Sequence, residues 1–134
     1  MLLSKYKNAA RFEPPSLLIK RFSAEYGVPT NEARAYFDET KKFLILCAMT
    51  KDASFSPSVK VDSMWHQFIL HTRDYFAFCD RLGTFVHHQP SEARQHDCYE
   101  FTRKEMRRVF GSVNERYWGD KAADCDSSSC DCCP

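Results

Sequence analysis

Apolar residues along this chain recur at intervals of three and four, which is the spacing of one face of an α-helix. The first such stripe follows two prolines and ends at Gly27. Because proline suits the first turn of a helix and glycine its left-handed end, the pattern predicts a helix over 16–26. A second stripe predicts a helix from Thr30, whose side chain we expect to act as the cap, to about residue 49.

The third stripe predicts one long central helix. It starts near Asp62, a good N-cap residue, and runs to Leu82, just before Gly83. Its expected core positions alternate between spacings of three and four: Val61, Trp65, Phe68, Thr72, Tyr75, Phe76, Cys79 and Leu82. A fourth helix is expected over 91–110, with Cys98, Phe101, Met106, Val109 and Phe110 facing inward. Ser112 and Glu115 form a capping-box pair that predicts a short last helix.

These elements predict an all-α fold, a single compact bundle of four to five helices. The helical domain is expected to span residues 1–119, with 1–13 as a loosely held leader, and 120–134 as a flexible, disordered Cys-rich C-terminal tail. A chain of 134 residues is long enough for one core, and its 43% apolar and 14% aromatic content can fill it. Only four glycines and six prolines are present, which argues against a many-turned β-sandwich or barrel.

Charge and cysteine content narrow the functional classes. The formal net charge is +1, so we expect neither nucleic-acid nor membrane binding. No segment has the length of a signal peptide core or of a membrane span. Seven cysteines is an odd number, and three of them (Cys47, Cys79 and Cys98) fall within helical patterns, which favours a reducing compartment. The sequence therefore predicts a cytoplasmic protein.

Candidate chemistry concentrates in residues 62–90, which hold four of the five histidines. On a helical wheel His66 lies away from the core stripe, and Asp62 precedes it by one turn on the same side. Asp62 could accept the ring N–H of His66 and fix its tautomer, as partners of metal-binding histidines commonly do. Adding His88 or His87 would give a donor set suited to zinc or iron. The alternative is a solvated polar face.

Helix geometry restricts this site. Along a continuous helix, residues 66 and 82 would be roughly 24 Å apart. The loop 83–90 would then have to return nearly extended for His66 and His88 to meet. Otherwise His87 and His88 would belong to another pocket, or would cap the fourth helix. Trp65 and Tyr75 would form a supporting wall, and Cys79 is expected to be a small apolar filler rather than a nucleophile. Without a phosphate loop or a known catalytic motif, the sequence leaves open whether the protein is an enzyme.

The C-terminal segment offers a second candidate metal site. Cys125, Cys130, Cys132 and Cys133 lie among aspartates and serines, and four thiols on a flexible chain can enclose a soft ion such as Cu(I) or Zn(II). Their spacing lacks the paired C-x2-C of a zinc ribbon. The tail could equally be an inert polar segment or a site of modification.

One segment resembles a known family. Val61-Asp62, Trp65-His66, Tyr75, Cys79, Gly83, Phe85 and His87-His88-Gln89-Pro90 are similar to the pattern of the bacterial glycine-rich domain-containing protein-like family, and more distantly to the repeated domain of plant glycine-rich domain proteins. That pattern often has a second histidine where Phe68 stands, and acidic residues where His87 and His88 stand. The resemblance implies a small helical domain and no defined reaction.

Two functional hypotheses follow. The first is a helical domain that holds a divalent metal, zinc or iron, through His66, His88 or His87. Asp62 would either orient the ring of His66 or bind the metal itself. The second is a non-catalytic module that binds a protein partner, or a metal-handling protein in which only the cysteine tail binds.

Overall fold

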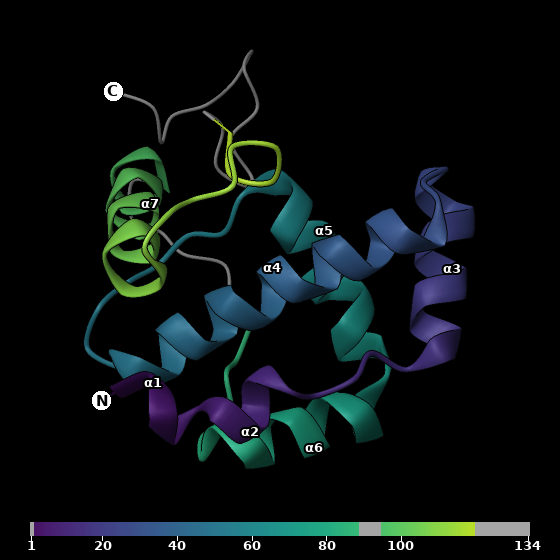
Figure 1. The fold of residues 1–134 in the computed structure, drawn as a ribbon, viewed down its shortest axis with the longest axis horizontal. Helices are drawn as coiled ribbons and strands as arrows, with labels where there is room; N and C mark the ends of the chain where they lie inside the picture. Colours follow the sequence, from purple (N-terminus) through teal and green to yellow (C-terminus); the bar gives the residue numbers. More distant parts are fainter. Residues whose placement is uncertain (1, 89–94, 120–134) are drawn as a thin grey trace.

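The computed structural model describes residues 2–88 and 95–119, and within these ranges the regular structure is entirely helical. The helices are α1 (Leu2–Lys5), α2 (Lys7–Ala10), α3 (Ser16–Tyr26), α4 (Thr30–Met49), α5 (Val59–Leu70), α6 (Thr72–Leu82) and α7 (Gln95–Phe110). Helix α4 crosses the middle of the molecule, with α3 and α7 at its two ends (Figure 1). The predicted all-α class is confirmed. No helix in the described part of the chain is long and apolar enough to cross a membrane.

Helices α3 and α4 begin and end as their sequence signals predict. Helix α3 starts after Pro15 and is closed by Gly27, whose φ of 65° places it in the left-handed region that favours glycine. Helix α4 starts at Thr30, and the N-cap is Pro29, which makes no side-chain capping hydrogen bond. The predicted cap is wrong because Thr30 is already the first helical residue, and Pro29 occupies the position before the helix.

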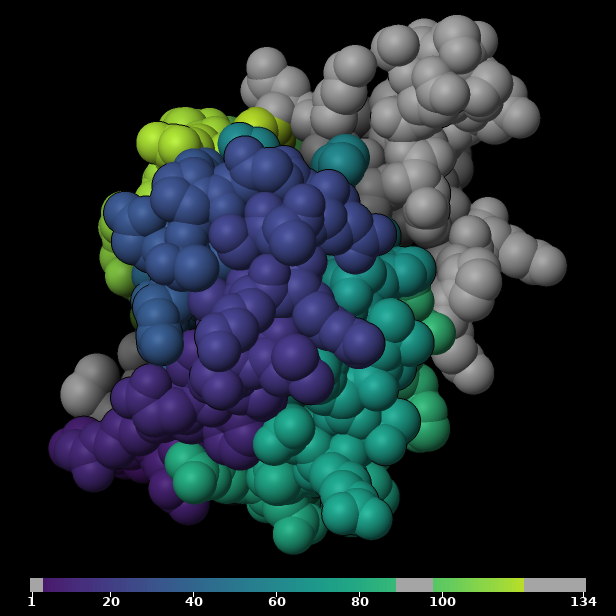
Figure 2. All heavy atoms as spheres, turned by 90° about the vertical axis from the view of Figure 1, so that its right-hand side faces the viewer, coloured from purple at the N-terminus to yellow at the C-terminus, as the bar shows by residue number. Residues whose placement is uncertain are grey.

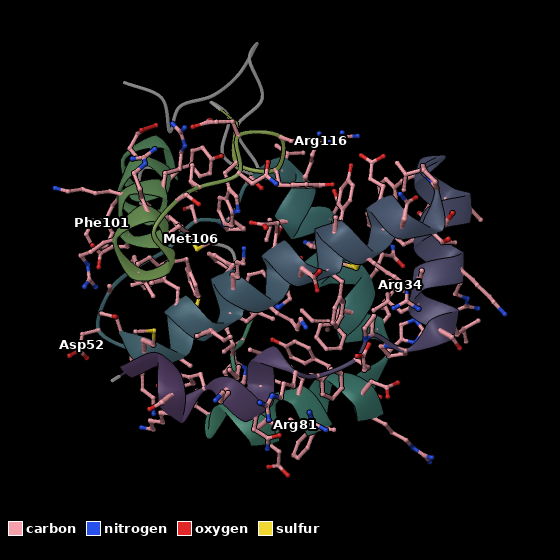
Figure 3. All side chains as sticks on the ribbon, in the orientation of Figure 1. Arg34, Asp52, Arg81, Phe101, Met106 and Arg116 are labelled. Atoms are coloured by element: carbon pink, nitrogen blue, oxygen red, sulfur yellow. The ribbon has the colours of Figure 1, made fainter. Side chains whose placement is uncertain are left out.

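The N-terminal residues are packed, not a loosely held leader. They form α1 and α2, and α2 lies against α4 and α6 (Figures 1 and 2). Three of their side chains enter the core at three-residue spacing: Tyr6, Ala9 and Phe12. Lys41 Nζ donates to the carbonyl oxygens of Ala10 and Phe12 at 2.8 and 3.0 Å, and Arg81 of α6 donates to the carbonyl of Asn8 (Figure 3). The prediction failed because this stripe is short and lacks capping signals.

The predicted long central helix is two helices. Helix α5 starts earlier than expected, since Ser58 and not Asp62 is the N-cap, with its hydroxyl accepting from Val61 N at 3.1 Å. The chain breaks at His71, where ψ is 71°, and α6 then starts in a new direction. Tyr75, Cys79 and Leu82 are buried as predicted, but Phe76 is 62% exposed, and Phe78, which was not expected in the core, is fully buried. The predicted inward positions of Thr72 and Phe76 are therefore wrong.

Helix α7 packs against α4 through a face that only partly matches the predicted one: Val109 and Phe110 are partly buried against the core, as expected. Tyr99, Thr102 and Met106 are buried, and only Met106 among these was expected (Figure 3). Phe101, expected inward, is 43% exposed and stacks on Phe55 instead, at 5.6 Å between ring centroids.

After α7 the chain makes a turn and not the predicted short helix. The carbonyl of Asn114 accepts from the backbone N–H groups of Tyr117 and Trp118, at 3.0 and 2.9 Å. The side-chain oxygen of Asn114 also accepts from the backbone N–H of Arg116 at 3.1 Å, a capping contact of the kind that was assigned to Ser112. The turn buries Tyr117 and Trp118 against the core. The predictions for the Cys-rich tail lie outside the described residues.

Candidate metal centre

The break at His71 determines how the histidines meet. Because α6 folds back from α5, residues 83–88 return beside the first turns of α5 instead of extending away from them. His88 therefore lies next to Asp62 and His66 without the long extended return that a continuous helix would require. The two imidazole-bearing stretches predicted to share a site come together in the fold.

Three ligand atoms converge at this point. Asp62 Oδ1 lies 2.6 Å from His88 Nε2, and Asp62 Oδ2 lies 3.3 Å from His66 Nε2. The two imidazole rings are 4.2 Å apart between centroids and nearly perpendicular, at 81°. One nitrogen from each histidine and one carboxylate oxygen all lie within 4.8 Å of one another. Asp62 is thus placed between the two rings, with one oxygen directed at each.

Helix α5 fixes two members of this group. Asp62 and His66 are four residues apart, so their side chains lie one turn apart on the same face. Ser58 caps the helix, which places Asp62 inside the first turn and leaves its carboxylate available to His66 and His88. The aspartate also lies where the helix dipole favours negative charge.

A buried hydrogen-bonded chain positions the segment that carries His88. Trp65 Nε1 donates to the hydroxyl oxygen of Tyr75 at 3.0 Å, and the Tyr75 hydroxyl in turn donates to the carbonyl of Val86. This chain links α5, α6 and the returning segment two residues before His88. The sequence did not reveal the role of Val86, because a backbone carbonyl leaves no residue-type signal.

Trp65 forms the inner wall of the centre. It is 6% exposed, and its ring lies 4.3 Å from the ring of His88 and 5.4 Å from that of Phe43, between centroids. Trp65 thus separates the His88 imidazole from the core. The supporting role of Trp65 and Tyr75 at a metal site stays a prediction.

Burial disfavours ionisation of Tyr75 and of Cys79. It raises the pKa of the Tyr75 hydroxyl far above its usual value, so the phenol stays a neutral hydrogen-bond donor. Burial also raises the pKa of the Cys79 thiol, although hydrogen bonds with the backbone of Val86 and with Tyr75 oppose this. Cys79 is 3% exposed and stays a thiol at neutral pH, as its predicted role of apolar filler requires.

His87 is directed elsewhere. It is exposed, lies outside the three-residue group, and its ring packs 4.6 Å from that of Phe85. It borders a separate polar hollow beside Cys47 and Cys98. Of the two adjacent histidines predicted as ligands, the fold brings only His88 to the centre, because neighbouring side chains on an extended segment point in opposite directions.

The donor set fits a divalent transition metal. Two imidazole nitrogens and one carboxylate oxygen are ligands of zinc and of non-haem ferrous iron. Metal–ligand distances near 2.0–2.2 Å place neighbouring ligand atoms roughly 3–3.6 Å apart. The three ligand atoms lie within 4.8 Å of one another, close to this spacing.

The fold and the site together define a small all-helical domain with a two-histidine, one-aspartate cluster on a helical hairpin. A family model described as UCP032817-like matches residues 4–119, and the chain belongs to this family. The resemblance to the glycine-rich domain-containing proteins is therefore wrong: it rested on one segment, whereas this match covers residues 4–119. No curated protein and no solved structure matches the chain.

Proposed function

We propose that this domain binds one divalent metal ion, zinc or ferrous iron, through Asp62, His66 and His88. The observation that carries the proposal is the meeting of three ligand atoms from two separate segments within 4.8 Å. Here α5 orders two ligands, and the Trp65–Tyr75–Val86 hydrogen bonds hold the segment of the third.

The proposed ion would keep open coordination positions. His66 is 56% exposed on one side of the cluster, while the side chains of Asp62 and His88 are 17% and 21% exposed on the other. Closed structural zinc sites use four protein ligands, and sites that bind water or substrate typically use three. The arrangement therefore supports a metal centre that exchanges an external ligand on the side of His66.

Metal analysis of matched histidine variants tests the proposal. The background is the full chain with Cys125, Cys130, Cys132 and Cys133 replaced by serine, so that tail thiols cannot contribute. After equilibration with Zn²⁺ and gel filtration, we expect about one zinc per chain. His66→Ala and His88→Ala should lose at least about 90% of it, since removal of one of three ligands eliminates a large part of the affinity.

His87→Ala is the matched control, because His87 adjoins His88 but lies outside the cluster. It should retain zinc fully. In the same background, saturating zinc should raise the melting temperature, and His66→Ala should abolish this increase. Equal zinc retention by all three histidine variants, or the absence of zinc from a folded parent protein, would refute the proposed centre.

A further inference from the structure

A pocket of about 480 Å³ lies on another part of the molecule, between α2, α4 and the segment that follows α7. Its size falls within the range of small-molecule sites. The walls are largely apolar and come from segments distant in the sequence: Tyr6, Ala10, Ala35, Ile45, Phe110 and Tyr117. None of the residues lining it belongs to the Asp62–His88 segment, so the pocket is separate from the candidate metal centre.

The charged side chains at this pocket differ in how many hydrogen-bond or ion-pair partners they already have. Three lysines (Lys7, Lys41 and Lys42) line it against two acids (Asp38 and Glu39), which leaves one positive charge in excess. Both oxygens of Glu39 are engaged, Oε1 by Trp118 Nε1 at 2.9 Å and Oε2 by Lys42 Nζ at 3.2 Å. Asp38 lies 3.6 Å from Lys41 Nζ.

The lysines differ in how firmly they are held. The Lys41 side chain is 11% exposed and donates to two backbone carbonyls, which fixes the end of α2 to α4. Lys42 is 45% exposed, and Lys7 is exposed on α2. Lys41 and Lys42 each lie beside an acid, Asp38 and Glu39, so Lys7 carries the excess positive charge and an incoming anion would meet its ammonium group.

We propose that this pocket binds a small amphipathic anion, a carboxylate attached to an apolar body. The apolar part would occupy the space between Ala35, Ile45 and Phe110, and the carboxylate would lie toward Lys7. Apolar enclosure provides most of the affinity of such ligands, and a few placed polar groups determine their orientation. Charge complementarity selects the anion over a cation of the same shape.

Isothermal titration calorimetry on the full chain tests this proposal with three probes of equal chain length, below their micelle concentrations. Decanoate should bind with one site per chain. Decanol should bind more weakly, and decyltrimethylammonium at least about tenfold more weakly than decanoate, since its positive charge would face the positively charged lysines. Binding of the cation as tight as that of decanoate, or no decanoate binding at millimolar concentration, would overturn the proposal.

Variants locate the site. Lys7→Glu should weaken decanoate binding by roughly fivefold and leave decanol unaffected, whereas Lys20→Glu, an exposed lysine on α3 away from the pocket, should change neither. Filling the pocket by Ala35→Phe should abolish binding. Ala10→Phe serves as a second filling variant because Ala10 is exposed and its replacement leaves the core intact. Decanoate binding that survives both filling variants would place the ligand elsewhere and refute the assignment.

Discussion

The Tyr75 hydroxyl is the most informative single atom to remove. It accepts from Trp65 Nε1 and donates to the carbonyl of Val86, and it is the connection between α5 and the segment that presents His88. Tyr75 is 2% exposed, so water cannot readily replace the lost oxygen. Tyr75→Phe keeps the ring and its edge-on contact with Phe68, at 5.0 Å between centroids, and removes only the hydrogen bonds.

The expected cost follows from the two groups left without a partner. A buried polar group that loses its partner costs about 1–3 kcal/mol. Trp65 is nearly buried and should lie within this range, while Val86 is only partly buried and should lie at its lower end. The free energy of unfolding should therefore fall by about 2–4 kcal/mol. For a domain of this length, that corresponds to a decrease in melting temperature of roughly 10 °C.

Urea unfolding monitored by circular dichroism measures the change. Tyr26→Phe is the matched control, because Tyr26 is 43% exposed and should change the free energy of unfolding by less than about 0.5 kcal/mol. Zinc affinity should also fall in Tyr75→Phe and stay unchanged in Tyr26→Phe, since only Tyr75 restrains the His88 segment. If Tyr75→Phe were as stable as Tyr26→Phe, the hydroxyl would not hold that segment in place.

Three further predictions concern the packing of the N-terminal residues, a buried thiol and the bridging aspartate. Phe12→Ala should lower the free energy of unfolding by about 3–4 kcal/mol, whereas Leu17→Ala, at a position 54% exposed, should have little effect in the same urea titration. Burial raises the pKa of the Cys47 thiol from near 9 to about 12, so at pH 8 it should react with iodoacetamide much more slowly in the folded than in the unfolded chain, as peptide mass mapping can show. Because the folded protein retains that proton longer than the unfolded chain, this group should make stability fall as pH rises from about 9 to 12, and a Cys47→Ala variant that showed the same alkaline slope would contradict the assignment. Asp62→Asn should lower zinc affinity at least about tenfold with little change in helix content, and unchanged zinc content would exclude the carboxylate as a ligand.

The sequence predicted the elements that have strong local signals. Pro15 and Gly27 bracket α3, and both of its ends follow from backbone restrictions that depend on residue type alone. The pairing of Asp62 and His66 on one helix face was also predictable, because it needs only the helical repeat.

The break between α5 and α6 was not predicted, because Leu70-His71-Thr72 contains neither glycine nor proline and the apolar spacing continues across it. Tertiary packing of Tyr75 and Phe78 against the core decides the new helix direction. A weak signal was present: Thr72 starts a segment with Asp74 in its first turn, which is a common beginning of a helix. The same break explains why the geometric objection to a shared His66–His88 site does not apply.

The candidate centre is also local in the chain. Its ligand residues and the hydrogen-bonded groups that support it are at most 26 positions apart. The entropy of loop closure grows slowly with loop length, so a cluster of such short sequence separation can assemble early, before distant segments such as α2 and α7 dock. Folding of this hairpin would then prepare the ligand geometry at little further entropic cost, and a bound ion would act as a cross-link across a single short stretch of chain.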